Sequence, residues 1–285
     1  MHTALSYFQA GRADAGYKLL KSSVLDGMYL GDSPGNFGQI SFYDAARGEC
    51  YRDFGDPIGV ASRVLIQGLF GILPDALNQQ IILRPGFPDD WDKASVSTPD
   101  INYRFTRKED TDTYHITQRF QTPLHPVLHV NARKEKIRSV KVNGVPATWQ
   151  SIESAHGYPL LSIQAEGTSS TTITIEWEGA PLHTLAVQEP VITSNGKLAL
   201  QIPSGASISQ VYDPQSVLAN HTVEATAFNA QIKGEPGHHT FFVYTHQGEM
   251  DWWQPVNIYI ENVRESPSYT CLLYTSPSPR DGATS

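Results

Sequence analysis

The densest group of reactive side chains in the sequence lies between Asp44 and Asp56. This thirteen-residue segment carries four carboxylates and two arginines, with tyrosines within it or beside it: Tyr43, Asp44, Arg47, Glu49, Tyr51, Arg52, Asp53 and Asp56. Two carboxylates on opposite sides of a glycosidic bond can serve as general acid and as base or nucleophile. Tyrosine rings pack on the apolar faces of sugars, and arginines bind sugar hydroxyls.

We therefore take Glu49 first and Asp53 second as catalytic candidates, and the other members of this loop as substrate-binding candidates. The alternative is that these charges pair with one another in a solvated loop. Asp56 then serves only as the N-cap of the following helix, with Pro57 in its first turn.

Three further patterns bear on chemistry. Asn36 lies in the loop 35–38, which lacks the lysine of a phosphate loop, so Asn36 either contacts a sugar or only shapes the turn. His125 and His129 flank a proline in an extended segment, and we predict no metal site and no cofactor. Trp252 and Trp253 form either a carbohydrate platform or a pair with one ring in the core and one between domains.

The composition is that of a folded chain without a basic face. Hydrophobic residues make up 40% and charged residues 18%, which excludes the weakly hydrophobic, highly charged class of disordered proteins. The formal net charge of −8 argues against a nucleic-acid partner, which needs a basic surface. Cys50 and Cys271 are too few for a disulfide framework, and no apolar run is long enough to predict a membrane span.

The elements that position these residues change type near residue 80. Apolar residues at helical spacing predict helices within 5–30 and from Pro57 to Ile72, the second ended by Pro74. From Ile81 onward the period becomes two, which predicts strands at Ile81–Pro85, Ile101–Phe105, Thr113–Phe120, Val127–Ala132, Ser139–Val145, Leu160–Ala165, Thr171–Trp177, Leu198–Ile202, Val223–Phe228, His239–Thr245 and Val256–Ile260. Asn143-Gly144 predicts a hairpin turn, and the short, regularly spaced strands favour β-sandwiches.

Several segments in chain order carry a resemblance to a known family. They are Gly35-Asn36-Phe37-Gly38, Asp53-Phe54-Gly55-Asp56-Pro57-Ile58-Gly59, Gly68-Leu69-Phe70-Gly71-Ile72-Leu73-Pro74-Asp75, and Ile82-Leu83-Arg84-Pro85-Gly86-Phe87-Pro88 followed by Trp91. Together they resemble the C-terminal part of a bacterial six-hairpin glycosidase. The resemblance is to an uncharacterised domain-of-unknown-function family near the α-L-rhamnosidase and α-L-fucosidase toroids. It covers roughly residues 1–180 and implies that the last hairpins of an α/α toroid pass into a β-sandwich.

We therefore expect an α+β multidomain chain: a short helical remnant of an (α/α)6 toroid followed by two mainly antiparallel β-sandwich domains. The incomplete toroid helices occupy 1–80, the first β-sandwich 81–180 and a second β-rich domain 181–263. Residues 264–285 are expected to be a disordered, artefactual tail, because the last sixteen residues resemble sequencing-adapter read-through. With most of the toroid absent, we expect an exposed apolar patch at Phe8, Leu20, Leu65, Leu69 and Phe70.

The resemblance implies a C-terminal fragment of a glycoside hydrolase that acts on plant or host polysaccharide and is inactive alone. Its partners would be a carbohydrate and the missing N-terminal toroid of its own parent chain. The parent would act in the periplasm or outside the cell. The alternative is a non-catalytic carbohydrate-binding or structural β-sandwich module.

Overall fold

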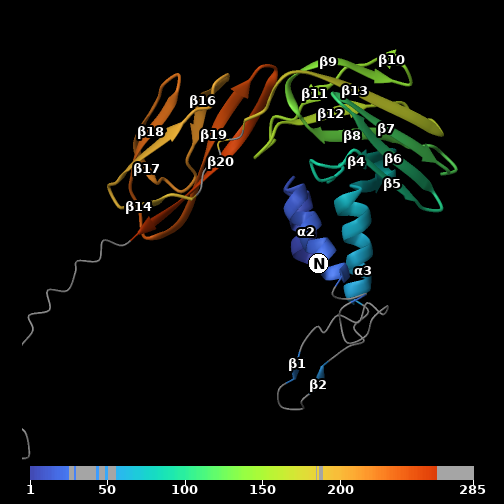
Figure 1. The fold of residues 1–285 in the computed structure, drawn as a ribbon, viewed down its shortest axis with the longest axis horizontal. Helices are drawn as coiled ribbons and strands as arrows, with labels where there is room; N and C mark the ends of the chain where they lie inside the picture. Colours follow the sequence, from blue (N-terminus) through green and yellow to red (C-terminus); the bar gives the residue numbers. More distant parts are fainter. Residues whose placement is uncertain are drawn as a thin grey trace, which may run out of the picture.

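A computed structural model describes residues 1–25, 29, 43–44, 49–50, 56–183, 185 and 189–261, with the backbone alone at 43–44, 49–50 and 56–58. Three helical segments pack beside a chain that is otherwise mostly strand (Figure 1). They are α1 (His2–Gln9), α2 (Ala13–Leu25) and α3 (Asp56–Arg63), which continues as the π-helical segment η2 (Val64–Leu69). The pair β1 (Tyr43–Asp44) and β2 (Glu49–Cys50) is antiparallel.

The first β-sandwich consists of a six-stranded and a five-stranded sheet. The larger has the order β10-β9-β13-β7-β6-β5, from β5 (Lys93–Ser97), β6 (Ile101–Lys108), β7 (Thr111–Gln118), β9 (Lys134–Val142), β10 (Val145–Pro146) and β13 (Ser170–Pro181). The smaller has the order β11-β12-β8-β4-β3, from β3 (Ile72–Asp75), β4 (Gln80–Leu83), β8 (His125–Asn131), β11 (Gln150–Ser151) and β12 (Leu160–Gln164), with the 3-10 turn η3 (Ala76–Asn78) between β3 and β4. All pairs are antiparallel except β4 with β8. Buried residues of both sheets share one core, which makes the unit a sandwich.

The second β-sandwich pairs a four-stranded sheet with a three-stranded one. The first has the order β14-β20-β19-β16, from β14 (Val191–Thr193), β16 (Ala206–Tyr212), β19 (Gly237–Gln247) and β20 (Met250–Glu261). The other has the order β15-β18-β17, from β15 (Lys197–Gln201), β17 (Leu218–Val223) and β18 (Ala227–Ile232). Alternate residues of these strands bury a second, separate core.

The hairpin tip of β19 and β20 belongs to the first core rather than the second. Met250 and Trp252 are both 0% exposed and pack in the first cluster, while Val256 onward packs in the second. Backbone bonds fasten the tip: the Glu249 amide donates to the Glu135 carbonyl at 2.7 Å, and the Trp253 amide donates to the Ala155 carbonyl at 2.8 Å. One strand therefore contributes to both hydrophobic cores.

The helices also pack into the first core, through Phe8 of α1. The Phe8 ring lies against three glycines from different segments: Gly16 of α2, Gly68 of η2 and Gly86 after β4. A Cβ at these positions would stand 2.9, 2.7 and 2.5 Å from ring atoms, closer than real Cβ contacts come. Only glycine lets the ring sit there, so the three segments are held around one side chain.

The expected exposed patch is therefore mostly wrong. Phe8, Leu20, Leu69 and Phe70 are between 4% and 7% exposed, because the first sandwich and the other helices cover them. Leu65 alone of the five is exposed, at 40%.

Two predicted elements differ from the structure. The helix predicted to reach Ile72 ends at Leu69, since Gly71 adopts φ +65° and a Cβ there would lie 1.8 Å from the Arg84 carbonyl oxygen. Pro74 lies inside β3, which is tolerated because β3 is an edge strand. The strand predicted at Val223–Phe228 is a turn, whose ends Val223 and Phe228 pair with each other.

Candidate functional site

The loop between Tyr43 and Asp56 that dominates the sequence analysis is described only in part. Tyr43 and Asp44 form β1 and pair with Cys50 and Glu49 of β2, so the backbones of Asp44 and Glu49 lie opposite each other. Asp56 is the first residue of α3, at the end of the helix where the sequence predicted it as the N-cap. Asn36, Arg47, Tyr51, Arg52 and Asp53 lie outside the described residues. Their proposed roles stay predictions.

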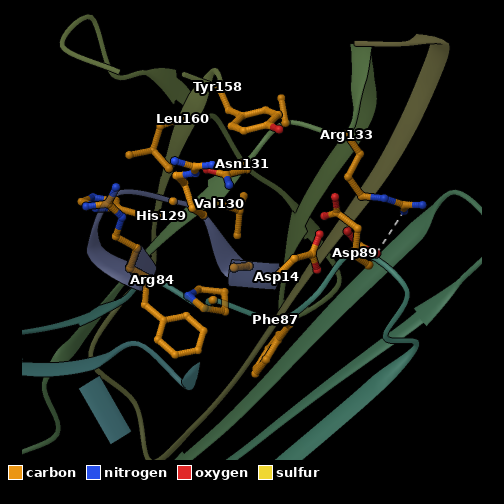
Figure 2. A pocket seen from close by; sticks show the side chains of 18 of the residues that line it. Asp14, Arg84, Phe87, Asp89, His129, Val130, Asn131, Arg133, Tyr158 and Leu160 are labelled. Carbon is orange, nitrogen blue, oxygen red and sulfur yellow. Dashed lines mark hydrogen bonds and ion pairs between the residues drawn. The ribbon is translucent and has the colours of Figure 1, made fainter. Parts of the chain in front are cut away.

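The structure places a cavity of about 560 Å³ between the helices and the first sandwich. Its walls come from four separate stretches of chain: the α1–α2 turn, the segment after β4, the β6–β7 hairpin, and the end of β8 with the start of β12. Figure 2 shows polar side chains converging on this space, among them Asp14, Arg84 and His129. The polar lining residues are Arg12, Asp14, Arg84, Asp89, Arg107, Asp112, Tyr114, His129, Asn131, Arg133 and Tyr158.

The positions of these walls follow from the local sequence. Gly11 takes φ +73° and lets the chain turn from α1 into α2, which brings Arg12 and Asp14 to the cavity. Gly86 permits the segment after β4 to approach both Phe8 and the Gly68 carbonyl, where a Cβ would come within 2.5 and 2.9 Å. Gly86, one of the three glycines around Phe8, therefore also shapes the cavity wall.

A cluster of charged side chains around buried Asp112 lines one side of the cavity. The Asp112 side chain is 1% exposed and accepts hydrogen bonds from Arg107 Nε at 2.8 Å, Arg133 Nη1 at 3.2 Å and Trp177 Nε1 at 3.1 Å. Burial lowers the pKa of Arg107, but its hydrogen bond to Asp112 and the Asp112 charge outweigh burial and leave that pKa raised. With its oxygens bonded on several sides, Asp112 is a structural anchor that fixes two arginines.

A pair of carboxylates lies at the rim beside this cluster. Figure 2 shows Asp14 and Asp89 on the same side of the cavity as Arg133. Partial burial of the carboxyl group raises the pKa of Asp89, and the nearby charge of Asp14 raises it further, against the opposing effects of Arg107 and Arg133. Asp89 therefore holds a proton more readily than a free aspartate does.

The opposite side of the cavity carries basic and amide groups. Arg84 and His129 lie together there, with Asn131 next to them (Figure 2). Burial lowers the pKa of His129, and the Arg84 charge lowers it further, so a neutral ring is favoured. Burial also lowers the pKa of Arg84. A neutral imidazole offers one donor and one acceptor, and the guanidinium offers donors only.

The arrangement suits a small ligand rich in hydroxyl groups. Donors and acceptors face the cavity from both sides, and the rings of Phe87 and Tyr158 lie at opposite ends of it in Figure 2. In the described part of the chain, no three His, Cys, Asp or Glu side chains gather closely enough to hold a metal ion.

Sequence reasoning missed this site. Its residues are scattered from Arg12 to Tyr158 and belong to no motif. The one available signal was the Arg84-Pro85-Gly86-Phe87-Pro88 run, in which a charged residue and a ring flank a glycine between prolines. Of the tryptophan pair, Trp252 is 0% exposed in the core, so the two rings do not form a platform together. The Trp253 backbone bonds the first sandwich at Ala155, while its ring lies beside Tyr244 and Tyr212 of the second.

Comparisons with known proteins add little. No family model and no curated protein matches this chain. Among solved structures, a chimeric titin Z1Z2 shares 14% identity over 59% of this chain and 100% of its own, with a TM-score of 0.23. The Ig1-2 module of the Drosophila receptor protein tyrosine phosphatase DLAR shares 10% over 54% of this chain and 91% of its own, with a TM-score of 0.19. The N-terminal periplasmic domain of ScsB from Proteus mirabilis shares 8% identity over 60% of this chain and 99% of its own, with a TM-score of 0.19. Scores this low carry no argument. No helix in the described ranges is long and apolar enough to cross a membrane.

Proposed function

We propose that this chain is the C-terminal, carbohydrate-binding part of a glycoside hydrolase, and that the cavity between the helices and the first sandwich holds a sugar residue of a polysaccharide. The observation that carries the proposal is the convergence of Arg84, His129 and Asn131 on one side with Asp14 and Asp89 on the other. The resemblance of residues 1–180 to six-hairpin glycosidases supports the same conclusion.

The chemistry of the cavity favours a neutral sugar over a charged ligand. Cationic Arg84 faces a carboxylate pair across the cavity. A polyanion or a polycation would therefore be attracted to one side of the cavity and repelled by the other. Hydroxyl groups are both donors and acceptors and can satisfy a guanidinium, an amide, a neutral imidazole and a carboxyl group together. The ring of Phe87 or Tyr158 offers an apolar surface to a sugar face.

Catalysis belongs, in this proposal, to the complete parent enzyme. Glu49 and Asp53 remain its candidate catalytic carboxylates, and secretion to the periplasm or beyond remains its proposed destination. The fragment itself binds sugar without cleaving it. The competing proposal is a purely structural sandwich that binds no carbohydrate.

Titration calorimetry with a panel of neutral and acidic mono- and oligosaccharides tests the proposal. Arg84→Met removes donors from the cavity while keeping an unbranched side chain. It is expected to weaken binding by at least about tenfold, the effect of a hydrogen bond from a charged group. Arg104→Met is the matched control, since Arg104 is exposed on β6 and does not line the cavity. No binding by the unaltered chain, or equal binding by Arg84→Met, would refute the sugar site.

A further inference from the structure

Three side chains on the outer face of the second sandwich form a continuous hydrogen-bonded chain. The Ser209 hydroxyl lies 2.7 Å from Nε2 of His246, and Nδ1 of the same ring is hydrogen-bonded to a carboxylate oxygen of Asp251. The two ring nitrogens of His246 are therefore engaged on opposite sides, one by the serine and one by the aspartate.

The strand register explains why these three residues meet. His246 of β19 stands directly opposite Asp251 of β20, one residue pair from the turn of the hairpin. On the other side of β19, Ser207 of β16 is the register partner of His246, but the pairing shifts between Ile208 and Gln210. Ser209 is the extra residue of this β-bulge.

The bulge leaves two successive side chains of β16 exposed. In a regular strand, successive side chains alternate between the faces, yet Ser209 and Gln210 are both exposed here while Ile208 is buried. Bulges redirect side chains in this way and are frequent beside active sites. Ser209 follows Ser207 on this exposed face, and the Ser209 hydroxyl is the one that lies within hydrogen-bond distance of the imidazole.

The carboxylate contact favours one tautomer of the neutral ring. A carboxylate accepts the Nδ1 hydrogen, so the neutral tautomer leaves Nε2 as an acceptor. Nε2 then accepts the serine hydroxyl hydrogen, which is the arrangement that activates a serine in hydrolases on unrelated folds. The described part of the chain also holds a His–carboxylate pair without any serine, His238 with Glu189 at 2.7 Å.

The trio is accessible and borders a row of aromatic rings. The side chains of His246 and Asp251 are 37% and 38% exposed. The Tyr244 ring lies 5.0 Å from the His246 ring and 4.9 Å from that of Trp253, and the Tyr212 ring lies 6.4 Å from Trp253. A flat or apolar group can rest on this row while a bond of the same molecule reaches Ser209.

We propose that Ser209, His246 and Asp251 form a nucleophilic serine site that takes carboxylic esters with a flat or apolar group. Ser209 Oγ attacks the ester carbonyl carbon and gives its proton to His246 Nε2. The carbon–oxygen bond to the alcohol breaks, the alcohol leaves with that proton, and an acyl-serine remains. Water then attacks the acyl-serine, again through His246, and releases the carboxylic acid and the free serine.

The site is independent of the proposed sugar cavity, because none of its three residues lines that cavity. Labelling of the full chain with a fluorophosphonate, followed by peptide mapping, is the direct test. The label is expected on Ser209. His246→Ala and Asp251→Asn are expected to slow labelling by about a hundredfold, the lower end of the contribution of a positioned general base. Hydrolysis of 4-nitrophenyl acetate is expected to fall in parallel.

Two matched variants separate chemistry from surface structure. Ser207→Ala removes the neighbouring exposed serine, and His238→Ala breaks the His238–Glu189 pair. Both variants are expected to label at the original rate. If His246→Ala fails to fold, as judged by circular dichroism, Asp251→Asn carries the test alone. No label on Ser209, or a rate unchanged in Asp251→Asn, would overturn the proposal and leave a structural hydrogen-bonded chain.

Discussion

Replacing Gly16 by alanine should destabilise this protein while Phe8 is present and stabilise it once Phe8 is removed. A Cβ at Gly16 would stand 2.9 Å from two atoms of the Phe8 ring. The ring has no room to retreat, because Gly68 and Gly86 already meet it closely from other segments. Overpacking of this kind costs about 1–3 kcal/mol. Alanine in a helix interior gains about 1 kcal/mol over glycine, so the net effect is a loss of up to about 2 kcal/mol.

In a Phe8→Ala background the ring is absent, and only the gain of about 1 kcal/mol remains. Phe8→Ala itself should lower the free energy of unfolding by about 3–5 kcal/mol, since its side chain is 4% exposed. Urea unfolding followed by circular dichroism measures all four corners of the cycle, and amide exchange across α2 reports the same change locally.

Gly59→Ala is the control for helix propensity, because Gly59 lies in α3 with nothing within 4 Å of its Cβ position. It should stabilise by up to about 1 kcal/mol in both backgrounds. A Gly16→Ala variant that stabilises as much with Phe8 present as in the Phe8→Ala background would refute the three-glycine account.

Two further predictions concern the charged groups around the cavity. Asp112→Ala should lower the free energy of unfolding in urea by about 3–5 kcal/mol, because it leaves the part-buried Arg107 and Arg133 without their shared partner. Asp110→Ala, at an exposed ion pair with Lys134, should change it little. Equal effects of the two variants would show that Asp112 is no anchor. The raised pKa of Asp89 means that the folded chain binds its proton more tightly than the unfolded chain, so stability from this group is lost as pH rises through the folded pKa. Asp89→Asn should therefore raise Tm near pH 7, with the gain shrinking below about pH 4, and a gain that is constant across pH would contradict the direction of this shift.

Local signals predicted much of the fold. Asn143 and Gly144 adopt φ of 53° and 79° between β9 and β10, which confirms the predicted hairpin turn. Period-two patterning located most of the strands because one face of each is buried. The errors arose where tertiary contacts decide: the helix ends at Gly71 because the backbone of Arg84 approaches there. Val223–Phe228 looks like a strand although the chain reverses within it.

The sites were beyond sequence reasoning for a different reason. The cavity joins Arg12 to Tyr158, and the serine chain joins Ser209 to Asp251. Neither set has a spacing that identifies it, since both depend on which strands pair and in which register. The Ser209 bulge is a shift of a single residue, and no propensity in the surrounding sequence marks it.

The shared strand β20 has a consequence for the order in which this chain can mature. Domains generally fold in sequence as they leave the ribosome, N-terminal first. The first sandwich here begins near residue 72, yet it lacks Met250 and Trp252 until the hairpin tip has been synthesised. Its core therefore stays open throughout translation of the second sandwich, with Trp252 as the last large ring to enter. A premature stop before residue 250 would expose the unfilled core to chaperones and proteases even though all of its own strands had been made.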